Sequence, residues 1–271
     1  MSNPVPDYLA KLNPHPRDAF ITFDEGPHIY TVHGDSSFTS VTTWNHTHFP
    51  HFDTNGIIER ILNNPRHSED STYKYYKQTK EEILAAWDKN RDEAALAGTK
   101  MHYDIECYYN NMDVNNDSVE YSWFLRFVKD FPELKPYRTE MMVYYEELKL
   151  SGSIDMIFEN PDGSLQIYDW KRCRDIAYEN SYGQTAITSC IKHLPDTNFW
   201  HYSLQLNVYK RILEVKYGKK VTALYLICLH PSSGYKTYDR ISVPILEKEI
   251  DDLKINKAKI FSFMKSGGIP I

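Results

Sequence analysis

Cysteine is scarce in this 271-residue sequence, and its four copies form no CxxC pair. Neither a zinc site nor a disulfide framework is indicated, so we expect reduced thiols in a reducing compartment. Long apolar runs are missing too, and we expect no membrane partner. The first twenty residues have no apolar stretch of the signal-peptide kind, and Asp7 and Asp18 count against a mitochondrial transit peptide. The sequence predicts an intracellular protein of the cytoplasm or nucleus.

Positive charge is also in short supply, with 31 Lys and Arg against 37 Asp and Glu and a net charge of −6. This balance counts against a protein that coats nucleic acid by bulk charge. It leaves room for an enzyme with a local basic groove and an acidic metal site. Internal repeats, low-complexity tracts and interdomain linkers are absent, so residues 1–271 are predicted to form a single domain.

Hydrophobic periodicity and turn residues give the order of the elements. A hairpin turns near Gly26, and a long helix begins with the capping box "TKEE" at Thr79, with a possible interruption at Gly98. Three strand-like segments follow, then a helix ending at Gly218, two more strands, and a last helix opened by Pro244. This order predicts a mixed α/β (α+β) fold in which helices flank a central mixed sheet.

Two aspartates flank the turn "NPDGS" symmetrically. Asp155 lies seven residues before Asp162, and Asp169 lies seven residues after it. In an antiparallel hairpin centred there, the two carboxylates face each other, and Lys171 shares the face of Asp169. Opposed carboxylates beside an amine suit a hard divalent cation and a nucleophilic water. A surface hairpin with solvated charges fits the spacing equally well, and a one-residue slip would separate the aspartates.

Four segments in this order carry a family resemblance: "FTSVTTW", "AGTKMHYDIE", "GSIDMIF" with "LQIYDWKR", and "YSLQLNVY". They resemble the motifs of the PD-(D/E)XK nuclease superfamily in its RecB-like exonuclease form, and the first is similar to a segment of the mitochondrial genome maintenance exonuclease branch. The segments span most of the chain. The resemblance implies a restriction-endonuclease-like core over residues 79–271 and an N-terminal, substrate-facing extension over residues 1–78.

The resemblance also implies a metal site. Its ligands would be His102, Asp155, Asp169, the backbone carbonyl of Trp170, Glu140 and Glu106. An imidazole among carboxylates favours Mn²⁺ while permitting Mg²⁺, as one ion or two. Ordinary alternatives exist for several members: His102 could be a satisfied helix residue, and Glu140 could pair with Arg138.

Further residues are assigned to catalysis and to substrate binding. Lys171, Asp155 and Asp169 would act in the chemical step, with Gln205 and Tyr209 positioning the lysine or the phosphate. The substrate would contact Ser40, Thr42, Tyr73, Lys74, Tyr76 and Arg172. The tyrosines and lysines of "TYKYYKQTK" suit single strands, although a solvated helix face explains that stretch more simply. The histidines of "HTHFPHF" have no regular ligand spacing.

These features predict a metal-dependent deoxyribonuclease, an exonuclease on single-stranded DNA or DNA ends that acts in replication, repair or recombination. Alternatives are an endonuclease on DNA or RNA, a non-catalytic nucleic-acid-binding module, and a hydrolase of small phosphoesters. The cofactor would be Mg²⁺ or Mn²⁺. No cysteine follows Cys228, so the iron–sulfur cluster of some RecB-like nucleases is not expected. A Walker A loop is also missing.

Overall fold

The computed structural model describes residues 5–232, 234 and 236–253. The chain groups into a larger unit, Met1–Pro50 with Met101–Ile271, and a smaller unit, His51–Lys100. The boundary at residue 100 falls within the long helix α5 (Lys80–Tyr109). The prediction of one nuclease domain with a boundary after residue 78 stays a prediction.

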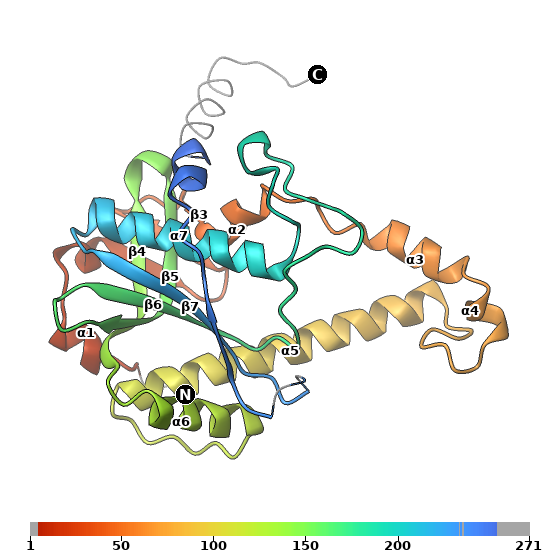
Figure 1. The fold of residues 1–271 in the computed structure, drawn as a ribbon, viewed down its shortest axis with the longest axis horizontal. Helices are drawn as coiled ribbons and strands as arrows, with labels where there is room; N and C mark the ends of the chain where they lie inside the picture. Colours follow the sequence, from red (N-terminus) through yellow and green to blue (C-terminus); the bar gives the residue numbers. More distant parts are fainter. Residues whose placement is uncertain (1–4, 233, 235, 254–271) are drawn as a thin grey trace. The chain divides into compact units, whose positions relative to one another are not determined.

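A six-stranded mixed sheet forms the centre of the larger unit (Figure 1). Its path runs β3-β5-β6-β7-β8, and β4 pairs with β5. The β3–β5 and β6–β7 pairs are parallel, and the other pairs are antiparallel. The strands are β3 (Thr39–Ser40), β4 (Lys135–Tyr145), β5 (Leu150–Glu159), β6 (Leu165–Lys171), β7 (Val221–Cys228) and β8 (Asp239–Ser242). The predicted mixed sheet flanked by helices is therefore confirmed.

Strand β5 has one edge that two other strands share. Strand β4 pairs along the whole of β5 on one side. On the other side, β3 pairs with Leu150 and Ser151, and β6 pairs with residues 156–159. In the register described, residues 152–155 have no ladder partner on this second side. The middle of β5 is therefore a gap in the sheet, and Asp155 lies in it.

Helices cover both faces of the sheet (Figure 1). On one face, α2 (Val41–His46) and α7 (Asn198–Lys216) pack against each other and on the strands. On the other face, the C-terminal part of α5 and α6 (Val119–Asp130) bury an aromatic cluster that includes Phe124 and Trp170. Apolar side chains at helical spacing on α6 explain its packing.

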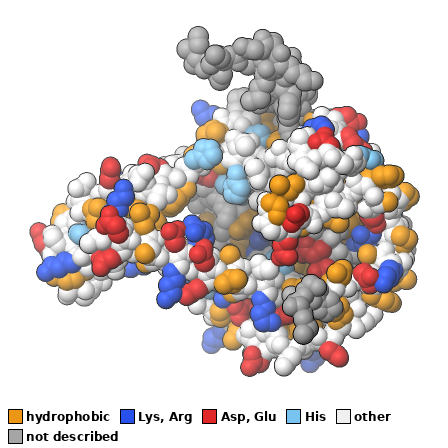
Figure 2. Space-filling model, turned by 180° about the vertical axis from the view of Figure 1, so that it is seen from behind, with side chains coloured by type: hydrophobic (Ala, Val, Ile, Leu, Met, Phe, Trp, Pro, Cys, Tyr) orange, Lys and Arg blue, Asp and Glu red, His pale blue; other side chains and the backbone are white. Residues whose placement is uncertain are grey.

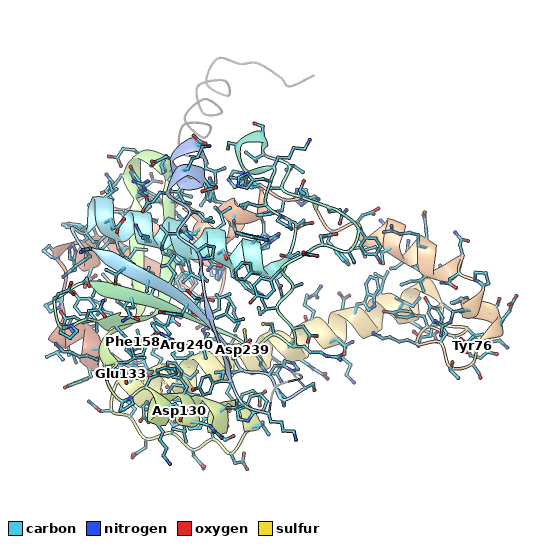
Figure 3. The ribbon with its side chains drawn as sticks, in the orientation of Figure 1. Tyr76, Asp130, Glu133, Phe158, Asp239 and Arg240 are labelled. Carbon is cyan, nitrogen blue, oxygen red and sulfur yellow. The ribbon has the colours of Figure 1, made fainter. Side chains whose placement is uncertain are left out.

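Helix α6 is absent from the sequence-based prediction. Ser118 caps it by accepting a hydrogen bond from the Tyr121 N–H. Near its far end, the Tyr238 hydroxyl donates to Asp130, and the Arg240 guanidinium donates to the Tyr168 hydroxyl at 2.7 Å. Phe158, Asp130 and Arg240 mark this face of the sheet in Figure 3.

Three local predictions concern the N-terminal hairpin and helix α5. The N-terminal hairpin forms as expected from β1 (Ile21–Asp24) and β2 (Ile29–Val32). Helix α5 has its capping box, because the Thr79 N–H donates to Glu82 and the Glu82 N–H donates to Thr79. The suggested interruption at Gly98 was wrong, since α5 continues to Tyr109. A single glycine costs a helix about 1 kcal/mol, which a 30-residue helix tolerates.

The remaining elements are short. In the larger unit they are α1 (Tyr8–Leu12) and the 3₁₀ segments η1 (Pro16–Phe20), η2 (Glu146–Leu148) and η3 (Ser189–Ile191). The smaller unit contains α3 (Thr54–Leu62), α4 (Arg66–Glu69) and the first part of α5, around a core of Ile58, Ile61 and Ile83. Residues 247–253 are helical, as predicted after Pro244. The rest of that predicted helix lies outside the described residues.

Candidate metal centre

Three side chains from three elements converge in the larger unit. One ligand atom from each of His102 on α5, Glu140 on β4 and Asp155 on β5 lies within 4.8 Å of the others. His102 Nδ1 is 3.5 Å from Asp155 Oδ2 and 3.8 Å from Glu140 Oε1. All three residues are partly buried. An imidazole nitrogen and two carboxylate oxygens at this spacing could hold a metal ion.

Glu140 reaches the cluster through an unusual backbone conformation. It lies between the pairs Thr139↔Met156 and Met141↔Ile154, level with Asp155 across the strands. Its φ is 42°, a left-handed value that is rare for a non-glycine residue inside a strand. Such a residue costs about 1–3 kcal/mol and persists where the surroundings hold it. Ser153 does so in part, because its hydroxyl donates to Glu140 Oε2 at 2.7 Å.

The register of the β5–β6 hairpin matches the one predicted from the turn. Met156 pairs with Tyr168, so the next step brings Asp155 level with Asp169. The backbone ladder ends there, and Asp155 Oδ2 instead accepts a hydrogen bond from the Trp170 N–H at 3.0 Å. This contact fixes the Asp155 carboxylate and leaves its remaining lone pairs for a ligand.

Asp169 and Lys171 form a buried ion pair beside this cluster. Lys171 Nζ is 2.7 Å from Asp169 Oδ2, and the Asp169 side chain is only 4% exposed. Lys171 Nζ also lies 4.6 Å from the centre of the Tyr202 ring, within cation–π range. The two contacts hold the amine in one place. Asp169 does not belong to the group of three ligand atoms, so its role as a metal ligand stays a prediction.

Burial and mutual charge shift the pKa values of these groups. Burial lowers the pKa of His102, but Asp155 and Glu140 outweigh it and raise the value to about 9. Burial raises the pKa of Asp169 to about 6, against the effect of Lys171. It also raises the pKa of Asp155, although the His102 charge opposes that rise. The Lys171 pKa is lowered by burial and raised by Asp169 and Asp155, with a net rise. The carboxylates need positive charge nearby to stay ionised.

Two other predicted ligands lie at the edge of the group. Glu106 is one helical turn from His102 on α5, and burial with the Glu140 charge raises its pKa to about 8. It is not among the three ligand atoms that lie within 4.8 Å of one another. The Trp170 side chain is buried in the aromatic cluster, and its backbone N–H donates a hydrogen bond to Asp155. Ligation by Glu106 or by the Trp170 carbonyl stays a prediction.

Gln205 and Tyr209 lie one turn apart on α7. The Tyr209 ring packs so closely on β5 that a Cβ added at Gly152 would lie 2.7 Å from the tyrosine hydroxyl. Burial raises the pKa of Tyr209 well above its usual value, with Asp155 and Asp169 adding to the rise and hydrogen bonding by Gln205 acting against it. Tyr209 therefore lies near the acidic group, and Gly152 makes room for it.

A cavity of about 420 Å³, lined by residues with polar side chains, opens beside the lysine. Lys171, Gln205 and Tyr202 line it, and α2 contributes Thr42 and His46. Of the predicted substrate residues, Thr42 thus shares a cavity with the catalytic candidates. Its wall also includes Asn45, Asp196, Thr197, Asn198 and His201. A space of this size can hold a small ligand or a part of a larger one.

Ser40 and Arg172 have partners within the protein. The Ser40 hydroxyl caps α2 by accepting from the Thr43 N–H and donating to the Thr43 hydroxyl. Arg172 Nε donates to Glu120 of α6 at 2.7 Å. Both predicted substrate contacts would have to be made in addition to these structural bonds.

The predicted substrate residues Tyr73, Lys74 and Tyr76 belong to the smaller unit. They lie in turns between α4 and α5. The alternative of a solvated helix face was therefore wrong, because these residues are not helical. Figure 3 labels Tyr76 in this segment. Tyr73 packs at the small core, and Lys74 Nζ lies 5.1 Å from the centre of the Tyr75 ring. On the face shown in Figure 2, acidic and basic side chains are interspersed over this unit.

Sequence reasoning missed several residues at the site. Ser153 lies within "GSIDMIF" and Tyr202 begins "YSLQLNVY", but neither residue was assigned a role. Tyr30 comes from the β1–β2 hairpin, and burial together with Glu140 and Asp155 raises its pKa. Only the fold could bring Tyr30 to this group, because about 110 residues separate it from Glu140.

Comparisons with known proteins add little. No family model matches the chain, and no curated protein matches it. Among solved structures, the chain is similar to a candidate exonuclease from Eubacterium rectale, at 13% identity and a TM-score of 0.31. The match covers 59% of this chain and 73% of that one. A likeness of this degree identifies neither a family nor a reaction. Among the described residues, no helix combines the length and apolarity of a membrane span.

Proposed function

We propose that the protein is a metal-dependent deoxyribonuclease of the PD-(D/E)XK type, an exonuclease acting on single-stranded DNA or DNA ends. The observation that supports it most is the convergence of His102, Glu140 and Asp155 within 4.8 Å, next to the Asp169–Lys171 pair. Such an arrangement would suit phosphodiester hydrolysis, which uses ligands for a cation and gains from an amine beside them.

The donor set fits a divalent cation. One nitrogen and two oxygens suit Mn²⁺ and admit Mg²⁺, and Asp169 and the Trp170 carbonyl are further candidates for its ligands. Hydrogen bonds from Ser153 and the Trp170 N–H orient the two carboxylates, as outer contacts do in metal sites. A bound cation would polarise a phosphate oxygen and lower the pKa of a water.

Side chains near the cation site would stabilise the transition state and position the substrate. Lys171, held by Asp169, stabilises charge that grows on the phosphate, or orients the attacking water. Gln205 lines the cavity beside Lys171 and would position the substrate there. Tyr209, packed on Gly152, supports that helix face. The buried position of the ion pair strengthens its electrostatic effect relative to water.

Substrate class separates this proposal from its alternatives. A polymer is favoured because the smaller unit carries a tyrosine- and lysine-rich segment suited to unpaired bases. The alternatives of an endonuclease, a non-catalytic binding module and a small-phosphoester hydrolase predict different products.

The test is a time course on end-labelled linear and circular single-stranded DNA with Mg²⁺, Mn²⁺ or a chelator. We expect metal-dependent loss of the linear strand, slow loss of blunt duplex and little loss of the circle. Rapid cutting of circles would show an endonuclease. Binding without cleavage would show a binding module, and hydrolysis of a small phosphodiester alone would show the third alternative.

A further inference from the structure

Two thiols lie side by side where strands β6 and β7 end. Cys173 Sγ is 3.8 Å from Cys228 Sγ. Cys228 is the last residue of β7, and Cys173 follows β6 by two residues. Because β6 and β7 are parallel, both cysteines lie at the same edge of the sheet. None of the motifs or ligands described above uses either residue.

The pair is close to the proposed catalytic lysine. Lys171 and Cys228 are register partners in the β6–β7 ladder. The Leu229 N–H also donates to the Lys171 carbonyl at 2.8 Å, so the backbone next to Cys228 is tied to Lys171. A covalent bond at Cys228 would act directly on the segment that carries the amine.

The two thiols differ in accessibility. Cys228 is only 7% exposed, whereas Cys173 is partly exposed. The contact with Cys228, with the charge of Lys171 adding to it, lowers the pKa of the Cys173 thiol despite burial. A partly exposed thiol with a lowered pKa, in contact with a second thiol, is the arrangement of an oxidisable pair.

We infer that Cys173 and Cys228 form a peroxide-sensitive modification site, which closes to a reversible disulfide. The Cys173 thiolate attacks the peroxide, forming an S–O bond and breaking the O–O bond, and the leaving oxygen takes a proton. The Cys228 thiol then attacks the sulfenic sulfur, an S–S bond forms, the S–O bond breaks, and water leaves. The two thiols lose two electrons in total, and the peroxide gains them.

Closure brings together two thiols that lie close to Lys171. The sulfur atoms must approach from 3.8 Å to about 2.05 Å. A misplacement of about 1 Å near a reacting centre can cost about 100-fold in rate. Provided that the proposed nuclease function is correct, we expect the disulfide to lower the cleavage rate about 10- to 100-fold and a dithiol to restore it.

The bond is tested without any assay of activity. The full-length reduced protein is treated with hydrogen peroxide in the presence of a chelator, and its thiols are then counted after denaturation. We expect the four free thiols to fall to two, with a mass loss of two hydrogen atoms and a Cys173–Cys228 linked peptide. Cys173→Ser and Cys228→Ser should each abolish the linked peptide, and Cys190→Ser should keep it.

The outcomes separate the two proposals. Oxygen atoms added to Cys173 without a linked peptide would overturn the inference, as would a link involving another cysteine. A linked peptide in a protein that cleaves no DNA even when reduced would leave the site standing and reject the nuclease. A linked peptide with unchanged cleavage would overturn the predicted effect on Lys171, and Cys173→Ser should resist inhibition if that effect is real.

Discussion

The acidic group of the larger unit and the tyrosine–lysine segment of the smaller unit were predicted to serve the same substrate, yet they are built differently. His102, Glu140 and Asp155 project from a helix and two strands, and neighbouring backbone and hydroxyl donors fix two of them. Tyr73 and Lys74 lie in turns, where both contact the Tyr75 ring. If the proposed function is correct, the rigid elements would carry the chemistry and the turns would contribute affinity.

The largest effect should come from removing one of the three proposed metal ligands, His102, Glu140 and Asp155. We expect Asp155→Asn to lower the single-turnover cleavage rate about 1,000-fold or more, about 4 kcal/mol, because a neutral amide holds a cation poorly. The asparagine oxygen can still accept from the Trp170 N–H, so circular dichroism should show an intact fold. Asp113→Asn, on an exposed loop, is the matched control. A rate near that of wild type would rule out the proposed metal centre.

The next effect should come from Lys171→Ala. We expect kcat to fall about 100- to 1,000-fold while the Kd for DNA changes less than about threefold, because the amine is assigned to the chemical step. Lys129→Ala on α6 controls for loss of one positive charge. A parallel weakening of binding would instead make Lys171 a contact to the phosphate in the ground state.

Metal affinity should depend on pH through His102. With a pKa of about 9 in the metal-free protein, His102 is protonated at pH 7 and must lose that proton to bind a cation. Affinity for Mn²⁺ should therefore rise about tenfold per pH unit from pH 7 and level off near pH 9. Calorimetry in buffers of different ionisation enthalpy should count about one released proton, and a flat profile would contradict His102 ligation.

The same proton affects folding stability in the metal-free protein. The folded-state pKa of His102 lies above its ordinary value of 6.5, so its stabilising contribution is complete below that pH and is lost as the pH rises through about 9. Thermal unfolding with a chelator should show this fall, and saturating metal should reduce it.

The smallest effect should come from the turns. Replacing both Lys74 and Lys77 with alanine should raise the Kd for single-stranded DNA about two- to fivefold and leave kcat unchanged. If both lysines contact phosphates, the slope of log affinity against log salt should fall by about 1.4. Lys89→Ala, in the same unit, is the control. An unchanged slope would exclude this segment from the DNA-binding surface.

The sequence carried enough information to predict the strands and the hairpin register at the site. The turn Asn160–Ser164 defines where β5 and β6 reverse, and symmetric spacing then places Asp155 level with Asp169. The start of α5 could be predicted for the same reason, since its capping box is formed by two residues three positions apart. Turns and helix caps can be predicted from the sequence because the groups that interact in them are neighbours in the chain.

The rest depended on contacts between distant segments. No local pattern predicts the left-handed φ of Glu140, which surrounding strands impose. Arg172 was assigned to substrate, but it also pairs with Glu120 across 52 residues of sequence. Helix α6, which supplies Glu120, is rich in aromatic residues that also favour strands, so its propensity is ambiguous. Tertiary packing determines the backbone conformation of Glu140, the partner of Arg172 and the helical state of α6.

The two-residue strand β3 has a consequence for how the chain can be shortened. It covers Leu150 and Ser151 on an edge of β5 that would otherwise expose their unpaired N–H and C=O groups next to Gly152. The helix that follows it buries Val41 and Trp44 in the main core. A fragment beginning at residue 79 would lose both and present an open edge for pairing with other copies. The first fifty residues thus protect the sheet against self-association.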